Sequence, residues 1–426
     1  MTRMKDSGIK WIGEVPEDWG IKPIKHIFGA IGSGTTPDSS KVEYYDGNIN
    51  WLQSGDLYKK DYVYAVSKTI TDLGYRSSAS LRIYQAPFLA IAMYGASIGN
   101  LAISKIDACV NQAVAVLKGE ENIVRFAKLA LEISKTELIF AAQGGTQPNI
   151  NQVLIKNWVI PFPSEIEIKK IADFLDKKVA QLDKVNSLLE EQIKTLEDYR
   201  KSLIYQTVTK GLDKTVPLKD SGVDWIGQIP EGWGVKPIKY CSRFQRGFGF
   251  PVELQGNDDG EIPFYKVSDL RGNSDEISIS KNYVDLQTAK QNAWVIVPSG
   301  AIIAPVIGAA LLNNNRKIST VPFISDNNTL AIIPNNKNKY FYYLFKVIDM
   351  NWFNNSSTIP AVNISKLANQ IVPTPKEEEQ KQIADFLEVQ IIKIDKLIEI
   401  KQKQINNINQ QRQTLIYDVV TGKRRV

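Results

Sequence analysis

Two groups of polar and basic side chains, mostly in loops, could recognise double-stranded DNA. Arg can pair bidentately with guanine and Asn or Gln with adenine, whereas Lys, Ser, Thr and Tyr can hold phosphates. The first group comprises Ser33, Thr35, Thr36, Lys41, Tyr44, Tyr45, Gln53, Lys59 and Lys60. The second comprises Arg243, Gln245, Arg246, Lys266, Arg271, Asn313, Asn314, Asn315, Arg316 and Lys317. Each position taken alone is more typical of an ordinary solvated loop.

Signatures of a catalytic site are missing from the sequence. There is no Walker A phosphate loop and no Asn/Asp-Pro-Pro-aromatic tetrapeptide of the amino-methyltransferase kind. The glycine-rich run 244–249 lacks the preceding apolar strand of a Rossmann unit. Residues 95–99 approach a nucleophile elbow, but His26 is the only histidine that could act as its base. We therefore expect no catalytic residues, and neither a methyltransferase nor a hydrolase.

The cysteines and the N-terminus indicate a cytoplasmic protein without a metal site. Cys109 and Cys241 are far apart in the sequence, which argues against a disulfide framework and against metal-ligand spacing. The opening residues lack the apolar stretch of a secretory signal. The longest apolar stretches, such as residues 301–312, are too short to cross a bilayer.

Length and composition leave the class of partner open. The 426 residues suggest two or three domains. A hydrophobic content of 43% with 23% charged residues is typical of globular proteins. The net charge of +6 is compatible with a nucleic-acid partner but does not require one.

The chain contains two copies of one plan. Residues 4–25 read MKDSGIKWIGEVPEDWGIKPIK, and residues 218–239 read LKDSGVDWIGQIPEGWGVKPIK. IADFL at 171–175 returns 212 residues later at 383–387, and LIY at 203–205 returns at 415–417. Such a period is too long for a solenoid and indicates a duplicated domain-sized unit. The segments at the ends of the two copies match, whereas the regions between them differ. We therefore expect two units with the same framework but different middle regions.

Each copy ends in a heptad pattern that predicts a coiled-coil helix. The first seam comprises Ile168, Leu175, Leu182, Leu189, Leu196 and Leu203. Beside it, a second row of Ile171, Val185 and Tyr199 is interrupted by Lys178 and Gln192. The second, less regular seam comprises Ile383, Leu387, Ile394, Leu397, Ile405, Ile408 and Leu415.

The two helices are expected to pair with each other in antiparallel fashion. Prolines precede each of them, Gly211 and Gly422 follow as helix stops, and a helix of about 43 residues would be roughly 65 Å long. Such pairing would relate two globular regions by a pseudo-two-fold axis. Lys401 and Gln411 interrupt the second seam, and Lys401 or Gln192 could set the register, although a solvated flank suits Lys401 as well. The alternative is that each helix packs only on its own globular region.

The two middle regions are typical of curved mixed sheets with a few helices. Strands are predicted at residues 49–53, 88–93 and 113–117, a helix at 122–140, and a glycine-rich loop at 144–149. The second region echoes the first, since residues 327–332 resemble residues 111–116. We expect an α+β protein whose two mixed-sheet regions are joined by the two long helices.

These features resemble the specificity subunits of type I restriction-modification systems. The resemblance covers the whole chain and depends on the Ser7 to Trp19 opening, its repeat around Trp225 and Trp233, and the stretch from Thr36 to Trp51. It also depends on residues 144–150 and on IADFL with its repeat. No departure from the family pattern stands out, although the second helix is the less regular.

The resemblance implies two target-recognition domains and two central helices. We expect the first domain at residues 1–163, its helix at 164–211, the second domain at 212–375, and the second helix with its tail at 376–426. Each domain would read one half of a split, asymmetric DNA site, and the helices would set the spacer between the halves.

The resemblance also implies the partners. Two methyltransferase subunits would join this non-catalytic chain in an adenine-methylating enzyme, and translocase-nuclease subunits would complete a restriction complex in a prokaryotic cytoplasm. S-adenosylmethionine, ATP and magnesium would be bound by those partners and not by this chain. The alternative is a coiled-coil scaffold whose globular ends bind proteins instead of DNA.

Overall fold

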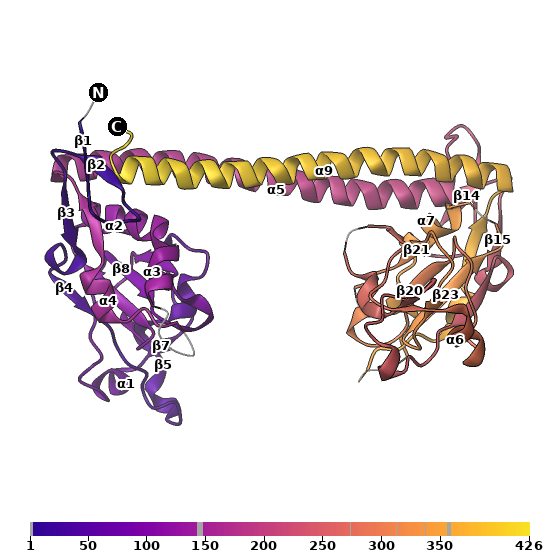
Figure 1. Ribbon diagram of the computed structural model, residues 1–426, viewed down its shortest axis with the longest axis horizontal. Helices are drawn as coiled ribbons and strands as arrows, with labels where there is room; N and C mark the ends of the chain where they lie inside the picture. The colour runs from indigo at the N-terminus through magenta and orange to yellow at the C-terminus, as the bar shows by residue number, and fades with distance from the viewer. Residues whose placement is uncertain (1–2, 143–147, 273, 312, 337, 356–358) are drawn as a thin grey trace. The chain divides into compact units, whose positions relative to one another are not determined.

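The computed structural model describes residues 3–142, 148–272, 274–311, 313–336, 338–355 and 359–426 (Figure 1). The chain divides into two compact units. Unit 1 contains residues 1–190 and 402–426, and unit 2 contains residues 191–401. The boundaries fall inside the two long helices, α5 (Glu165–Lys210) and α9 (Glu377–Val420), so each helix contributes one segment to each unit.

Unit 1 contains a mixed β structure that we call head 1 (residues 20–162). A five-stranded sheet has the order β4-β11-β8-β9-β6, and a three-stranded sheet has the order β10-β5-β7. β6 pairs with β9 and β10 with β5 in parallel, whereas the other neighbours are antiparallel. The strands are β4 (Ala30–Gly32), β5 (Tyr45–Leu52), β6 (Tyr62–Val63), β7 (Thr69–Ile70), β8 (Phe88–Ala92), β9 (Leu101–Ser104), β10 (Cys109–Val110) and β11 (Val114–Lys118).

The helix predicted at residues 122–140 is two helices, α2 (Glu121–Ile133) and α3 (Lys135–Ala141). They part at Ser134, whose hydroxyl donates to the Ala130 carbonyl and accepts from the Trp158 indole at 3.0 Å. Such a hydroxyl bond competes with the regular helical pattern, which the hydrophobic periodicity does not reveal. Two shorter helices, α1 (Asp72–Arg76) and α4 (Gln152–Asn157), complete head 1. Residues 144–147 of the predicted loop lie outside the described residues.

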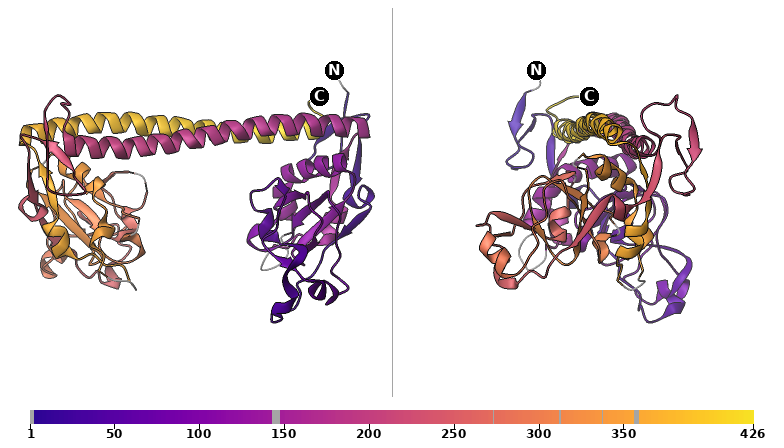
Figure 2. Two further views of the ribbon diagram at one scale, coloured as in Figure 1. Left: turned by 180° about the vertical axis from the view of Figure 1, so that it is seen from behind. Right: turned by 90° about the vertical axis from the view of Figure 1, so that its right-hand side faces the viewer.

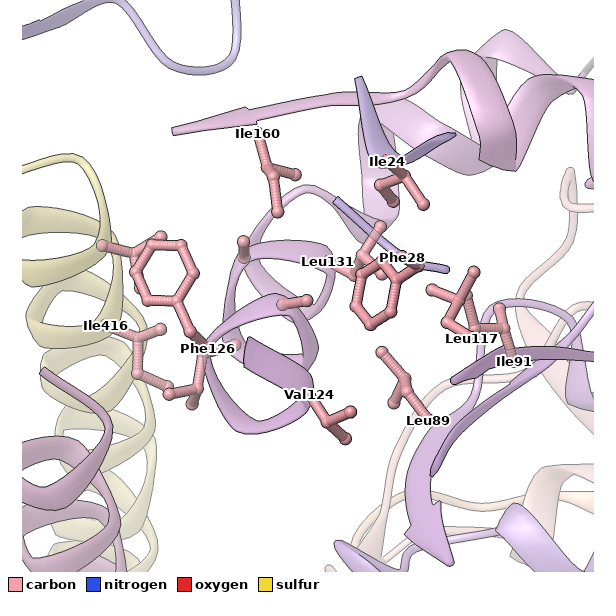
Figure 3. Close-up of a cluster of buried hydrophobic side chains, with 14 of the residues drawn as sticks. Ile24, Phe28, Leu89, Ile91, Leu117, Val124, Phe126, Leu131, Ile160 and Ile416 are labelled. Atoms are coloured by element: carbon pink, nitrogen blue, oxygen red, sulfur yellow. The ribbon is translucent and has the colours of Figure 1, made fainter. Parts of the chain in front are cut away.

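Helix α2 joins the sheet of head 1 to the long helices. Figure 3 shows Phe126 beside Ile416 of α9, while Val124 points toward Leu89 of β8. These side chains belong to one apolar cluster, and Ile416, Val124 and Leu89 have no exposed surface. The head and the helix segments of unit 1 therefore share one large apolar cluster.

The repeated Trp-rich segment seals the helix ends of unit 1. Its strands β1 (Met4–Asp6) and β2 (Glu14–Pro16) form a hairpin, and β3 (Gly20–Pro23) pairs with β12 (Val159–Phe162). The buried Trp19 donates to Glu167 of α5, and the Tyr417 hydroxyl of α9 donates to the Ile12 carbonyl at 3.0 Å. Strand β1 and the C-terminal end of α9 accordingly lie close together in unit 1 (Figures 1 and 2).

Unit 2 repeats this plan in head 2 (residues 234–374). The sheet orders are β16-β23-β20-β21-β18 and β19-β17-β22, which match those of head 1, with β17–β22 and β18–β21 parallel. The strands are β16 (Ser242–Arg246), β17 (Ile262–Tyr265), β18 (Glu276–Ile277), β19 (Tyr283–Val284), β20 (Ile302–Pro305), β21 (Lys317–Ser319), β22 (Ile324–Ser325) and β23 (Thr329–Pro334).

The remaining elements of unit 2 also follow unit 1. A hairpin of β13 (Leu218–Asp220) and β14 (Gln228–Pro230) precedes β15 (Gly234–Pro237), which pairs with β24 (Ile371–Thr374). The buried Trp233 donates to Glu379 of α9 at 2.9 Å. The helices are α6 (Leu286–Gln291), α7 (Tyr340–Val347) and α8 (Ile364–Asn369). The α+β class and the duplication are therefore confirmed.

Within each unit, α5 and α9 are antiparallel partners. In unit 1, Asp183 faces Arg412 and Asn186 faces Asn409, so three residues forward on α5 correspond to three back on α9. In unit 2, Arg200 pairs with Asp395 at 2.5 Å and Gln192 accepts from Lys401 at 2.6 Å. The antiparallel pairing predicted from the heptad patterns is therefore confirmed within each unit, and the helices also pack on the heads.

Two details of the predicted seams need correction. The second row on α5 runs through Val179, Asn186, Ile193 and Arg200, which keeps the seven-residue repeat but lies one residue further along the helix than the predicted row. Val185 and Tyr199, predicted for that row, are 44% and 56% exposed, and Lys178 and Gln192 are exposed too.

On α9, Leu397 is 47% exposed, and its neighbour Ile398 lies on the less exposed face. The spacing from Ile394 to Ile398, Lys401 and Ile405 then keeps the three- and four-residue steps of a regular seam. Arg412, rather than the exposed Gln411, holds the next polar position. Of the other predicted positions, Ile168, Leu175, Ile383, Leu387, Ile394 and Ile405 are buried, and Leu182, Leu189, Leu196, Leu203, Ile408 and Leu415 are partly buried.

The helix stops lie where they were expected. α5 ends directly before Gly211 and α9 two residues before Gly422, and both glycines have positive φ. Within the described residues, no helix combines the length and apolar character that a membrane span requires.

Candidate nucleic-acid interface

Two parallel strands of head 1 end side by side and present polar residues. β5 and β10 pair with Leu52 opposite Val110, and the Asn111 N–H donates to the Leu52 carbonyl at 3.1 Å. Gln53 therefore follows one strand end and Asn111 the other. The carboxylate of the buried Asp56 accepts the Gln53 N–H at 2.9 Å, which fixes the backbone as it leaves the sheet.

Head 2 contains the same arrangement with different side chains. β17 and β22 pair with Tyr265 opposite Ser325, and the Asp326 N–H donates to the Tyr265 carbonyl at 2.9 Å. Lys266 follows β17, and its N–H donates to Asp269 at 2.8 Å. Lys266 thus corresponds to Gln53, and Asp326 to Asn111.

A glycine-containing loop lies against each strand end. A Cβ built on Gly34 would lie 1.8 Å from the Val110 carbonyl oxygen, and one built on Gly247 would lie 1.9 Å from the Asp326 oxygen. Only glycine allows these close approaches. We call Gly34, Gln53 and Asn111 platform 1, and Gly247, Lys266 and Asp326 platform 2.

Several predicted DNA-binding residues gather at the platforms. The Thr36 hydroxyl donates to Gln112 at 2.6 Å, and Ser33 accepts from Gln152 at 2.8 Å. Ser33 and Thr35 flank Gly34 and Thr36 follows them, so these contacts bring the loop side chains close to the end of β10. In head 2, Gln245 and Arg246 precede Gly247 directly, and Arg246 is exposed.

Aromatic rings support platform 2. Phe250 stacks on Phe264 with ring centroids 3.9 Å apart, and the Lys266 ammonium lies 6.0 Å from the Phe250 ring centre. That ammonium also donates to Gln255 at 3.0 Å. Burial raises the pKa of Asp326, although hydrogen bonds from Asn328 and the charge of Lys266 oppose the shift. Platform 2 therefore combines an accessible cation with a carboxylate that is 5% exposed.

Other predicted residues of head 1 lie away from the platform. Tyr45 donates to the Pro37 carbonyl at 2.6 Å, and burial raises its pKa. Lys41 donates to the Tyr44 hydroxyl at 3.1 Å. Lys59 and Lys60 line a separate cavity of about 200 Å³, which also includes Lys128 and Lys135.

Two predicted residues of head 2 are not accessible. Arg316 is 5% exposed and donates to the Ile348 carbonyl at 2.8 Å and to Asn314, and burial lowers its pKa to about 10. Lys317 is 6% exposed within β21. The Asn-rich run before them suggested a solvated loop, whereas the chain turns inward at Asn314. We correct the prediction by removing both from the DNA-binding set.

The remaining predicted residues of head 2 are accessible but scattered. Arg243 and Arg271 are exposed, as is Asn313, whereas Asn314 and Asn315 are partly buried. Asn314 has φ +53° and its side chain accepts the Met350 N–H, which indicates a structural role.

Sequence reasoning missed Asn111, Gln112, Gln152 and Asp326. The similarity of residues 111–116 to residues 327–332 pointed to the right segments, but with the wrong register. Asn111 caps Ala113 N–H, and Asp326 caps Asn328 N–H in the same way, so Asn111 corresponds to Asp326 and not to Asn327. Among the described residues, no group of three or more His, Cys, Asp or Glu side chains could hold a metal ion.

Comparisons with known proteins agree with the duplicated plan. The model of the family described as type I restriction modification DNA specificity domain matches residues 16–197 and again residues 230–410. The MjaIX specificity subunit of a type I restriction enzyme from Methanocaldococcus jannaschii is 27% identical over 435 residues, which cover 97% of this chain and 95% of that protein. The EcoBI specificity subunit from Escherichia coli is 25% identical over 340 residues, or 74% and 69% of the two chains.

Solved structures share the fold. A chain from a structure of the type I R-M system has a TM-score of 0.74 at 13% identity, with 95% of this chain and 98% of that chain covered. The HsdS subunit from Thermoanaerobacter tengcongensis has a TM-score of 0.55 at 14% identity, with 98% and 99% covered. At these identities the likeness concerns the fold alone.

Proposed function

Because this chain belongs to the type I restriction-modification DNA specificity family and is a DNA-recognition subunit, we propose that head 1 and head 2 each read one half of a bipartite, asymmetric site. One observation carries the proposal. Platforms 1 and 2 have the same backbone arrangement but different polar side chains. Two heads with the same backbone but different polar side chains are suited to recognising two half-sites of different sequence.

The long helices would set the spacer between the half-sites. α5 has 46 residues, which corresponds to roughly 69 Å at 1.5 Å per residue. Half-sites on one face of B-DNA lie about 34–36 Å apart, or multiples of this distance. Paired helices are stiff, unlike a flexible linker, and a stiff element favours one spacing.

The chain acts with partner subunits of a restriction-modification complex, and we assign two methyltransferase subunits to it. They would methylate adenine, and S-adenosylmethionine, ATP and magnesium would be bound by them and by translocase-nuclease subunits. Exposed apolar residues on α9 of unit 2, namely Val389, Ile392 and Ile400, support docking of a partner on the helices. The purified chain with DNA and methyl donor should give no methylated product, and turnover by the chain alone would contradict a non-catalytic role.

A head exchange tests the two-reader proposal. Residues 24–162 are replaced by the corresponding region of a relative, and the methylated site is determined by sequencing the methylome of cells that express the complex. One half of the site should change while the other half stays the same. Changes in both halves, or in neither, would refute modular reading.

A salt titration tests DNA binding itself. Phosphate contacts release counterions, so the affinity of the assembled complex for duplex DNA should fall steeply as the salt concentration rises. A scaffold whose heads bind only proteins would show no duplex binding at any salt concentration.

A further inference from the structure

Gln53 and Lys266 occupy the same backbone position in the two heads. Their φ and ψ angles are −112° and 161° for Gln53 and −110° and 165° for Lys266. Each follows the last residue of a central strand, and each N–H donates to an aspartate three residues later, at 2.9 and 2.8 Å. Both side chains are half-buried. The two side chains therefore leave their platforms from matching starting points.

The surroundings hold these positions firmly. Asp56 also accepts the Ser67 N–H at 3.0 Å, and Asp269 accepts the Ser280 hydroxyl at 3.2 Å. The preceding residues Leu52 and Tyr265 have no exposed surface. A side chain that reads a nucleobase needs a rigid backbone beneath it. If the backbone moves, the hydrogen-bonding geometry that distinguishes one nucleobase from another is lost.

The two side chains differ in hydrogen-bonding capacity. The Gln amide offers a donor and an acceptor, which match N7 and the N6 amino group of adenine. The Lys ammonium offers only donors, which match O6 and N7 of guanine. An ammonium cannot accept the hydrogen bond that the adenine amino group donates.

We infer that Gln53 and Lys266 are corresponding specificity residues, with Gln53 reading an adenine in one half-site and Lys266 a guanine in the other. This inference rests on the proposed function, since it requires that the platforms face DNA. It goes further by assigning one base class to one side chain in each head.

Exchange of the two residue types provides the test. Gln53→Lys and Lys266→Gln are introduced separately into the chain, each variant is assembled with its methyltransferase partners, and the methylome of expressing cells is sequenced. Gln53→Lys should replace adenine by guanine at one position of one half-site, and Lys266→Gln should cause the reverse change in the other half-site. Each platform already accommodates the incoming residue type in its counterpart, so both variants are expected to fold.

Methionine variants measure the contribution of each contact. Gln53→Met and Lys266→Met keep an unbranched side chain but remove the strong donors and acceptors. Discrimination at the assigned base should fall roughly 5- to 150-fold, the range of a bidentate contact, while the other half-site keeps its preference. Lys214→Gln, which removes an exposed charge outside both platforms, should leave every base preference unchanged.

The outcomes separate this inference from the proposed function. A two-part site that persists unaltered in the Gln53 and Lys266 variants would overturn the residue assignment and leave two-headed reading intact. Absence of any two-part methylated site with the unmodified chain would instead refute the proposed function. Loss of discrimination in both half-sites from a single substitution would also overturn the assignment.

Discussion

Arg412 on α9 donates to Glu132 on α2 at 2.6 Å and faces Asp183 on α5 at 3.4 Å, so that one guanidinium joins both long helices to head 1. The corresponding residue in unit 2 is Arg200, which lies 212 positions earlier and pairs with Asp395. Lys346 of α7 corresponds to Lys128 of α2, because its ammonium pairs with Asp275 directly before β18, as the Lys128 ammonium pairs with Asp61 directly before β6. Arg200 and Lys346 line a cavity of about 520 Å³, whereas Arg412 reaches its head directly.

This difference predicts unequal effects of two matched substitutions. Arg412→Met should lower the free energy of unfolding by about 1–3 kcal/mol, because it leaves partly buried carboxylates without their charged partner. Arg200→Met should cost less than about 1 kcal/mol, because its pair with Asp395 is more exposed to solvent. Denaturant midpoints of the two variants provide the comparison. Equal losses of unfolding free energy in the two variants would show that the contact between Arg412 and Glu132 does not contribute to stability.

Asn186 predicts a gain in stability at the helix seam. Its amide donates to Asn409 at 2.8 Å, but its buried side-chain oxygen has no hydrogen-bond partner among the described residues. Asn186→Leu should therefore raise the free energy of unfolding by about 1 kcal/mol, at the expense of register specificity. Asn407→Leu, at an exposed position of α9, is the control and should have little effect. A lower unfolding midpoint for Asn186→Leu would contradict the expectation.

The helix register can be tested by insertion. Four residues, about one helical turn, are added to α5 between residues 184 and 197. The insertion moves Arg200 past Asp395, so the pairing must shift or break. Methylome sequencing should show a changed spacer preference, or denaturation should show reduced stability. An unchanged site together with unchanged stability would count against a paired-helix spacer.

Asp326 predicts a pH-dependent difference between the platforms. Burial raises the pKa of Asp326 in the folded state, so its contribution to stability is present below the unfolded-state pKa and is lost as the pH rises through the folded-state value. Asp326→Asn should therefore be more stable than the unmodified chain at neutral pH, and the difference should shrink in acid. Thermal unfolding at several pH values measures it.

The converse substitution is available in head 1. Asn111→Asp places a carboxyl at the corresponding position and should destabilise the chain at neutral pH, with recovery as the pH falls. If the difference in stability between each variant and the unmodified chain does not vary with pH, burial of a charged carboxylate cannot be the cause of that difference.

The platform glycines predict position-specific damage. Gly34→Ala and Gly247→Ala would each force a methyl group against a backbone carbonyl, at an expected cost of about 1–3 kcal/mol. Gly249→Ala is the control, because a Cβ there would meet no atom within 4 Å. Each platform variant should weaken discrimination only in its own half-site. Equal behaviour of all three variants in unfolding and methylome experiments would disprove the close packing.

The sequence predicted the elements that depend on local periodicity. Heptad spacing identified both long helices, and Gly211 and Gly422 marked their ends. Alternation and apolar runs identified β5, β8 and β11. The exact face of each seam was harder to predict. Val185 and Leu397 are apolar but lie one residue before the true seam positions Asn186 and Ile398, and because Asn186 is polar, hydrophobicity alone favoured the wrong row.

The candidate interface depended on contacts that no local pattern reveals. β5 and β10 are more than fifty residues apart in sequence, and only their parallel pairing brings Gln53 beside Asn111. Arg316 follows a run of asparagines whose composition is typical of a DNA-reading loop, but tertiary packing buries its side chain. Residue type placed Gln53 and Lys266 among the candidates, whereas their accessibility and grouping could be seen only in the fold.

The matching backbone at Gln53 and Lys266 has a genetic consequence. Glutamine and lysine codons differ at a single nucleotide, so one point mutation can exchange the two side chains. Because neither the helices nor the hydrogen bonds of Asp56 and Asp269 would be disturbed, such a mutant could still assemble with its existing partners. Under our assignment, one nucleotide change would therefore alter the sequence that is recognised in one half-site, and with it the set of genomic sites at which the complex acts.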